Sequence, residues 1–137
     1  MPRNLLLVLA LLLSAPCARA MIGDDLDQLR AVYGSAASVG NQMLFQHDGY
    51  SIAVYFDNDR SAMEIFVCDG SKKGKTEITQ ADIDTILKAE GAGQEWGSVQ
   101  TKSGQPTWLR ADKKLIARFN QSQGILTVMV TVPVNSK

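Results

Sequence analysis

Alternating hydrophobic and polar residues dominate the middle of this chain, and a period of two is typical of half-buried β-strands. Residues 50–56 alternate in this way. Asp48-Gly49 separates them from a second predicted strand at 42–47, and this dipeptide favours a tight hairpin turn because both positions accept positive φ. A polar turn at 57–59 then leads into residues 61–68. In that last segment three apolar residues alternate: Met63, Ile65 and Val67. We therefore predict a three-stranded antiparallel meander.

Two segments instead repeat their apolar residues with the period of an α-helix. In residues 23–34, Asp24 is a candidate N-cap and Gly34 a natural stop. In the second segment Thr79 is the candidate N-cap, and Asp82 stands three residues later, as a capping box requires. Gly91 and Gly93 end that helix. Both helices are short, so packing must hold them in place.

Three further segments are predicted as strands: 107–111, 114–120 and 124–134, the last of which alternates most clearly. Residues 35–40 are predicted as a connection of small residues, and residues 97–106 as a loop. The predicted fold class is α+β, with a single antiparallel sheet of five or six strands and two short helices packed on one face.

The two predicted helices share the pattern D-[LI]-D-x-[LI]-x4-G at an offset of 57 residues. Strands follow each of them, so the order of elements is compatible with a tandem helix–meander repeat. Ordinary capping explains the same similarity, because aspartate commonly begins a helix and glycine commonly ends one. The pattern leaves both explanations open.

The first 20 residues differ from the rest of the chain. Arg3 precedes an apolar run at 5–13, and Ala18 and Ala20 occupy the two small-residue positions of an A-x-A cleavage site. The apolar run is shorter than the roughly 20 residues that span a bilayer. We predict a signal peptide at 1–20, cleaved after Ala20. A single α+β domain then covers 21–137 and is exported to the periplasm or the cell exterior.

Charge and cysteine content exclude several classes of protein. The chain holds 14 basic and 14 acidic residues, and cleavage would remove Arg3 and Arg19. The resulting slight negative charge gives no electrostatic reason to bind nucleic acid or an anionic membrane. Cleavage would also remove Cys17 and leave Cys68 as the one cysteine, so an intramolecular disulfide is excluded. Cys68 could still be oxidised or pair between chains.

A cysteine–histidine nucleophile pair can be weighed, because His47 is the only histidine. The predicted hairpins place both His47 and Cys68 opposite Tyr50, on the two strands that flank it. Two strand spacings of about 10 Å in total would then separate them. A general base must lie roughly 3 Å from its partner. We therefore expect no such pair.

Other catalytic and metal-binding patterns are weak. Asp57 and Asp59 lack the glycine and the distal glutamate of a calcium loop, and they fit a hairpin turn. Glu90 and Glu95 could be imagined as a paired acid and base beside a glycine-rich connection. There is no G-x-S-x-G elbow and no glycine-rich loop between a strand and a helix. We expect no metal, no cofactor and no catalytic residue that the sequence identifies.

The two tryptophans flank the loop at 97–106. Trp96 follows the second helix, where packing against the helix end is its expected role. Trp108 shares one strand face with Arg110, which predicts an exposed recognition surface with a cation–π pair. Trp108, Arg110 and Trp96 are therefore the candidate binding residues.

Residues 22–34 resemble the opening of the SmpA/OmlA family, small outer-membrane assembly lipoproteins related in fold to β-lactamase-inhibitor-like proteins. A glycine leads into a short amphipathic helix that ends in glycine, and a meander follows. The chain departs from the family because it lacks the lipid-attachment cysteine motif. It also has Ser35-Ala36 where the family usually places a proline. The resemblance implies a non-catalytic envelope protein that acts through protein contacts.

These observations predict a small exported bacterial protein that serves as a non-catalytic binding or interaction module of the cell envelope. A protein partner is expected; nucleic acid and a membrane span are not. Two alternatives stay open. One is a small secreted enzyme that uses a carboxylate or Cys68, and the other is a protein inhibitor of a hydrolase.

Overall fold

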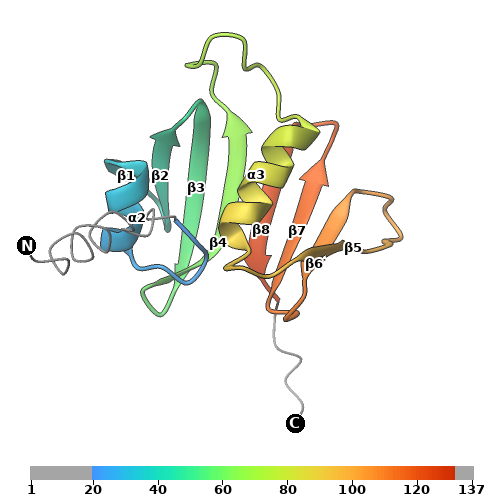
Figure 1. Ribbon diagram of the computed structural model, residues 1–137. Helices are drawn as coiled ribbons and strands as arrows, with labels where there is room; N and C mark the ends of the chain where they lie inside the picture. Colours follow the sequence, from blue (N-terminus) through green and yellow to red (C-terminus); the bar gives the residue numbers. More distant parts are fainter. Residues whose placement is uncertain (1–19, 132–137) are drawn as a thin grey trace, which may run out of the picture.

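The computed structural model describes residues 20–131 and shows one sheet with two helices on one of its faces (Figure 1). The order of elements repeats, because each helix is followed by four strands. The first set is α2 (Leu26–Tyr33), β1 (Ala36–Val39), β2 (Gln42–His47), β3 (Tyr50–Asp57) and β4 (Arg60–Cys68). The second set is α3 (Gln80–Glu90), β5 (Trp96–Ser98), β6 (Thr107–Arg110), β7 (Leu115–Asn120) and β8 (Ile125–Val130).

The eight strands form one antiparallel sheet in the order β1-β2-β3-β4-β8-β7-β6-β5. Each set of four is a meander, and the two meanders join where β4 pairs with β8. The short strands β1 and β5 therefore lie at the two outer edges. The prediction of a single antiparallel sheet in an α+β fold is confirmed, and the described chain shows the helix–meander order twice.

The predicted strand number was wrong, because the sheet has eight strands rather than five or six. The two missed strands are β1, with the sequence AASV, and β5, with the sequence WGS. Small residues have weak strand propensity, and neither segment shows a clear alternation. Both become strands because a neighbouring hairpin strand offers its free edge. Residues 132–134 of the last predicted strand lie outside the described residues.

The predicted hairpins match the structure. Asp48 and Gly49 both have positive φ, as do Asn58 and Asp59 in the next turn. These turns place His47 and Cys68 on either side of Tyr50 in the sheet. The predicted separation of the histidine from the cysteine is thus confirmed.

The second helix begins as predicted, with Thr79 and Asp82 forming a capping box. The first helix begins one residue later than predicted. Its N-cap is Asp25, which forms a capping box with Gln28. Asp24 instead accepts a hydrogen bond from the backbone nitrogen of Met21 at 2.9 Å. Asp24 therefore fastens the segment before the helix.

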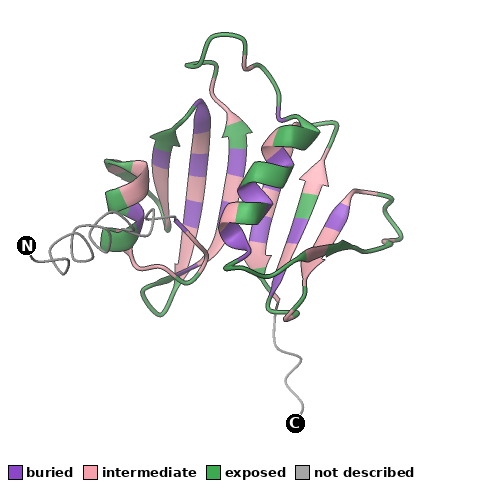
Figure 2. Cartoon of the chain, in the orientation of Figure 1, coloured by how far each residue is buried: buried purple, intermediate pink, exposed green. Residues whose placement is uncertain are grey.

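The core lies between the two helices and the sheet face that they cover (Figure 2). Leu29 anchors α2, while three residues anchor α3: Ile83, Ile86 and Leu87. The sheet contributes one continuous face, including Phe45, Ile52, Val54, Phe66, Leu126 and Val128. On β4 this face carries Glu64 and Phe66, so the apolar series singled out in the sequence (Met63, Ile65 and Val67) lies on the opposite face.

Candidate functional site

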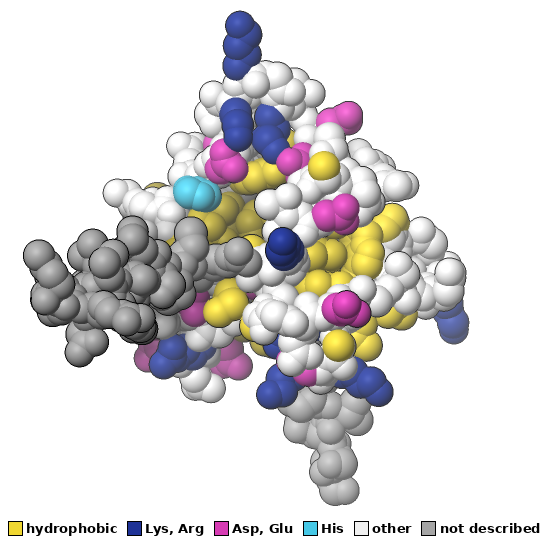
Figure 3. Space-filling view, in the orientation of Figure 1, with side chains coloured by type: hydrophobic (Ala, Val, Ile, Leu, Met, Phe, Trp, Pro, Cys, Tyr) yellow, Lys and Arg dark blue, Asp and Glu magenta, His cyan; other side chains and the backbone are white. Residues whose placement is uncertain are grey.

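A cavity of about 380 Å³ lies between the two helices, above the covered face of the sheet. We call it the inter-helix pocket. Both helices, strands β2 to β4 and the loop before α3 line it with these residues: Ala20, Val32, Tyr33, His47, Asp48, Tyr50, Ile52, Phe66, Lys72, Lys75, Asp82, Thr85, Ile86, Ala89 and Glu90. In Figure 3, hydrophobic side chains floor a hollow on this side of the molecule, and charged side chains of both signs lie above it.

The basic residues at the rim are already paired. Lys72 Nζ lies 2.7 Å from Asp48 Oδ1. Lys75 contacts both Asp82 and the hydroxyl of Tyr50, and its ammonium also lies 4.6 Å from the centre of the Tyr50 ring. The bond to Asp82 raises the pKa of Lys75. Burial opposes ionisation of Asp82, but hydrogen bonds from Lys75 and the Thr79 backbone outweigh it and lower the pKa of Asp82. The rim is therefore polar but close to neutral.

Two buried glutamates come close together here, and one of them, Glu90, belongs to the lining of the pocket. Glu64 on β4 is 0% exposed and Glu90 at the end of α3 is 1% exposed. Glu90 Oε2 accepts the backbone N–H of Ile22 at 2.8 Å, and Glu64 Oε2 accepts the hydroxyl of Tyr33 at 3.4 Å. Within residues 20–131, no N–H or hydroxyl group donates to Glu64 Oε1. Glu64 and Glu90 influence each other, since a side-chain hydrogen bond between them contributes to the pKa of both.

Two negative charges on this buried pair would cost much free energy, because both carboxylates would be desolvated and would repel each other. Burial raises the pKa of Glu90, and the charge of Glu64 raises it further. Burial also raises the pKa of Glu64, although bonds from Glu90 and Tyr33 oppose that rise. Burial and the nearby Glu64 likewise raise the pKa of Tyr33. We infer that Glu90 keeps a proton and donates it to Glu64.

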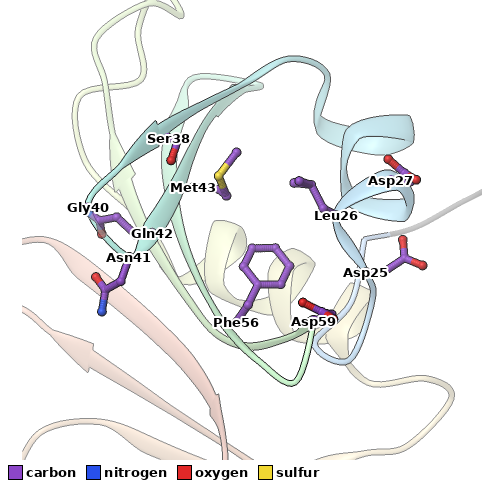
Figure 4. A pocket seen from close by; sticks show the side chains of 10 residues that line it. All are labelled: Asp25, Leu26, Asp27, Ser38, Gly40, Asn41, Gln42, Met43, Phe56 and Asp59. Atoms are coloured by element: carbon purple, nitrogen blue, oxygen red, sulfur yellow. The ribbon is translucent and has the colours of Figure 1, made fainter.

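A second hollow, of about 620 Å³, lies at the other end of α2 (Figure 4). Leu26, Met43 and Phe56 point into it and give it an apolar wall. Three acidic residues stand around it: Asp25, Asp27 and Asp59. The hollow is acidic at its margin, whereas the inter-helix pocket combines a neutral rim with the buried carboxyl of Glu90.

The predicted binding residues lie on the helix-covered face of the second meander. Trp96 pairs with Arg110 across β5 and β6, and Trp108 shares its face with Ala117 of the core. Both indoles are half-buried and pack against the core. Trp96 Nε1 donates to the carbonyl of Leu87 at 2.7 Å, which fastens the end of α3 to β5.

Arg110 has a structural role at this edge. Its guanidinium binds both carboxylate oxygens of Asp112, at 2.9 and 2.8 Å, and also donates to the carbonyl of Glu90 at 2.9 Å. The Arg110 side chain is 12% exposed. Trp96 and Arg110 line a hollow of about 370 Å³ beside β5, and Trp108 lines one of about 180 Å³ under the neighbouring loop.

Replacing Trp96 with phenylalanine is expected to lower the free energy of unfolding by about 1 kcal/mol. The change keeps an aromatic ring but removes the donor to Leu87, and a single hydrogen bond contributes roughly that amount. Chemical denaturation measures the effect, with Trp108→Phe as the matched control because its indole N–H donates no hydrogen bond to any group within residues 20–131. Equal losses in the two variants would contradict the role assigned to the Trp96 N–H.

The other residues considered for catalysis do not form a reactive group; they are Cys68, Glu90 and Glu95. Burial raises the pKa of Cys68, which disfavours the nucleophilic thiolate. Glu95 is exposed and Glu90 is buried, so the two acids considered together in the sequence occupy different environments. Among residues 20–131 no cluster of three or more potential metal ligands is found. Within the same residues no helix has the length and apolar character needed to cross a bilayer.

Comparisons of the chain with models of known families, with curated proteins and with solved structures yield no match. The resemblance of residues 22–34 to the SmpA/OmlA family stays a prediction. The site must therefore be interpreted from its own chemistry.

Sequence reasoning missed Glu64 entirely and considered Glu90 only beside Glu95. One signal was present, because Glu64 interrupts the apolar run at 62–68 of β4, and a charged residue in a central strand needs a partner. Its partner comes from α3, 26 positions along the chain, and no local pattern indicates that pairing.

Proposed function

We propose that this chain is a small exported, non-catalytic binding module of a bacterial envelope, and that its ligand enters the inter-helix pocket. The observation that carries the proposal is a cavity of about 380 Å³ that combines an apolar floor, a rim of paired charges and the buried carboxyl of Glu90 in its wall. Ligand pockets typically have volumes of about 300–1,000 Å³, mostly apolar walls and a few convergent polar groups.

The lining indicates the class of ligand. Ile52, Phe66 and Ile86 offer apolar contact, while the Tyr50 hydroxyl offers polar contact. Since Lys72 and Lys75 are already paired with carboxylates, the rim does not favour a strongly anionic molecule. We expect a compact, mainly apolar molecule, or an apolar side chain of a partner protein, with one neutral polar group.

Replacing Ala89 with phenylalanine is expected to fill the pocket and to reduce ligand occupancy at least tenfold. Ala89 lines the pocket from α3, whereas Ala81 is an exposed residue of the same helix outside the lining. The control is therefore Ala81→Phe, which should leave occupancy within twofold of wild type. Native mass spectrometry of protein recovered after export measures the bound fraction directly.

The comparison of Ala89→Phe with Ala81→Phe has two possible results. A bound small molecule that is lost in Ala89→Phe and kept in Ala81→Phe supports the proposal. Equal occupancy in the two variants would place the ligand elsewhere and overturn it. Circular dichroism of both variants confirms that each is folded before the comparison is made.

A second candidate is acid–base catalysis by Glu90. The favouring observation is that Glu90 lines a pocket and has a raised pKa, a combination that is common among catalytic carboxyls. Burial argues against it, because Glu90 is 1% exposed and its Oε2 already accepts the Ile22 N–H. Hydrolysis of a panel of chromogenic glycosides and esters that disappears in Glu90→Gln, while Glu95→Gln keeps it, would favour catalysis.

A further inference from the structure

The backbone just before α2 is held against acidic groups by several hydrogen bonds. Met21 N donates to Asp24 Oδ2 at 2.9 Å, and the next nitrogen, of Ile22, donates to Glu90 Oε2 at 2.8 Å. Gly23 N donates to the hydroxyl of Ser61 at 2.9 Å, and that hydroxyl donates to the Met21 carbonyl at 3.2 Å. The segment is therefore fixed on β4 and α3, and the position of Met21 N is defined.

Asp24 contacts this nitrogen directly, and Glu90 accepts the next nitrogen along the chain. The charge of Asp24 raises the pKa of both Glu64 and Glu90, so these three carboxyls form one cluster. Tyr33 faces the same cluster and can supply only a neutral hydroxyl. Arg60 reaches the segment from outside, but its Nη1 contacts the carbonyl of Gly23 at 3.4 Å and the amide oxygen of Gln28 at 3.3 Å. Within the described residues, no Lys or Arg side chain forms an ion pair with these three carboxyls.

Cleavage after Ala20 would turn Met21 N from an amide into a primary ammonium. Adjacent backbone nitrogens lie less than about 4 Å apart. The new ammonium would thus sit in direct contact with Asp24 and within about 7 Å of Glu90 Oε2. Ala20, which is buried and lines the inter-helix pocket, would leave at the same step.

We infer that Met21 is the mature N-terminus and that its α-ammonium binds Asp24 as the missing cation of the Asp24–Glu64–Glu90 cluster. One proteolytic step then supplies this charge and removes a residue from the wall of the inter-helix pocket. The inference rests on the export part of the proposed function. It does not depend on which ligand the pocket takes.

The α-amino pKa tests this assignment. The chain beginning at Met21 is compared with the chain beginning at Ala20, by NMR titration of the terminal residue. An unperturbed α-amino group has a pKa of about 7.7–8.0. The Met21 chain is expected to show a pKa at least one unit higher, since an opposite charge favours the protonated form. The Ala20 chain, whose ammonium is displaced by one residue, should titrate near the ordinary value.

Two variants identify the partner. Asp24→Asn in the Met21 chain should remove most of the rise, whereas Asp27→Asn should not, because the Asp27 side chain is 94% exposed on α2. An ordinary α-amino pKa in the Met21 chain, or a rise that Asp24→Asn leaves intact, would overturn the inference. If Asp24→Asn does not fold, the comparison of the two starting residues decides alone.

Export with the natural leader provides the second readout. Expression of the full chain in a bacterium, followed by N-terminal sequencing of the exported protein, should yield Met21 as the first residue. Another first residue would overturn the inference even if the pocket binds its ligand. A raised α-amino pKa without any bound ligand would support the inference while the proposed pocket fails, so the two outcomes are distinguishable.

Discussion

The free energy of unfolding is expected to fall as the pH rises above about 4.5, by roughly 1 kcal/mol per pH unit for each buried carboxyl that stays protonated in the folded state. Glu64 and Glu90 cause this decline, because burial raises the pKa of both above the ordinary value of 4.5. Urea denaturation of the chain beginning at Ala20, repeated across this pH range, measures it.

The sign follows from proton binding. Above about pH 4.5 the two glutamates of the unfolded chain lose their protons, while the folded chain retains at least one. The unfolded state thus binds fewer protons, and stability decreases with rising pH. Asp48, Asp82 and Asp112 act in the opposite direction, because their pKa values are lowered in the folded state. Their stabilising contribution grows as the pH rises toward about 5 and is constant above it, so it does not affect the slope at higher pH.

Glu90→Gln is expected to reduce the slope by at least half. The amide can donate to Glu64 as the protonated carboxyl does, and its oxygen can still accept the Ile22 N–H. Glu95→Gln is the matched control, since Glu95 is exposed in the same part of the chain. A flat profile for the wild-type chain, or an unchanged slope in Glu90→Gln, would contradict the shared proton.

Replacing Leu29 with alanine is expected to lower the free energy of unfolding by about 2–5 kcal/mol, the usual cost of removing a buried leucine side chain. Leu29 is 0% exposed and is the one buried residue of α2, a helix of only 8 residues. Short helices depend on packing for their stability. The inter-helix pocket should lose its α2 wall, formed by Val32 and Tyr33, together with this anchor.

Leu26→Ala provides the control within the same helix. Leu26 is only partly buried, so its loss is expected to cost less than half as much. Thermal and chemical denaturation give the two free energies, and hydrogen exchange of the α2 amides reports whether the helix has come loose. Similar costs for the two variants would show that Leu29 is not the anchor of α2.

The sequence predicts the elements whose signals are local. The hairpin at Asp48-Gly49 and the capping box of Thr79 and Asp82 each depend on a few adjacent residues, and both appear in the structure. β1 and β5 have no such signal. They form because their backbones pair with the otherwise free edges of β2 and β6, and this pairing does not depend on a local sequence pattern.

The candidate site was less predictable than the fold. Its carboxyl pair joins β4 to α3, and the raised pKa values arise from burial that only the assembled sheet and helices create. The two tryptophans are large and few, and the sequence therefore predicts them as binding residues. Trp96 is used to hold α3, and Arg110 is held by Asp112 rather than displayed beside Trp108.

Binding at the inter-helix pocket is the central claim, and NMR titration of the ¹⁵N-labelled chain beginning at Met21 with a library of small, mainly apolar fragments tests it most directly. The account predicts that the largest chemical-shift changes will cluster at Val32, Thr85 and Ala89, and that Ala89→Phe will abolish them. Shifts that centre instead on the hollow of Leu26, Met43 and Phe56, or on the β5 edge at Trp96, would contradict it.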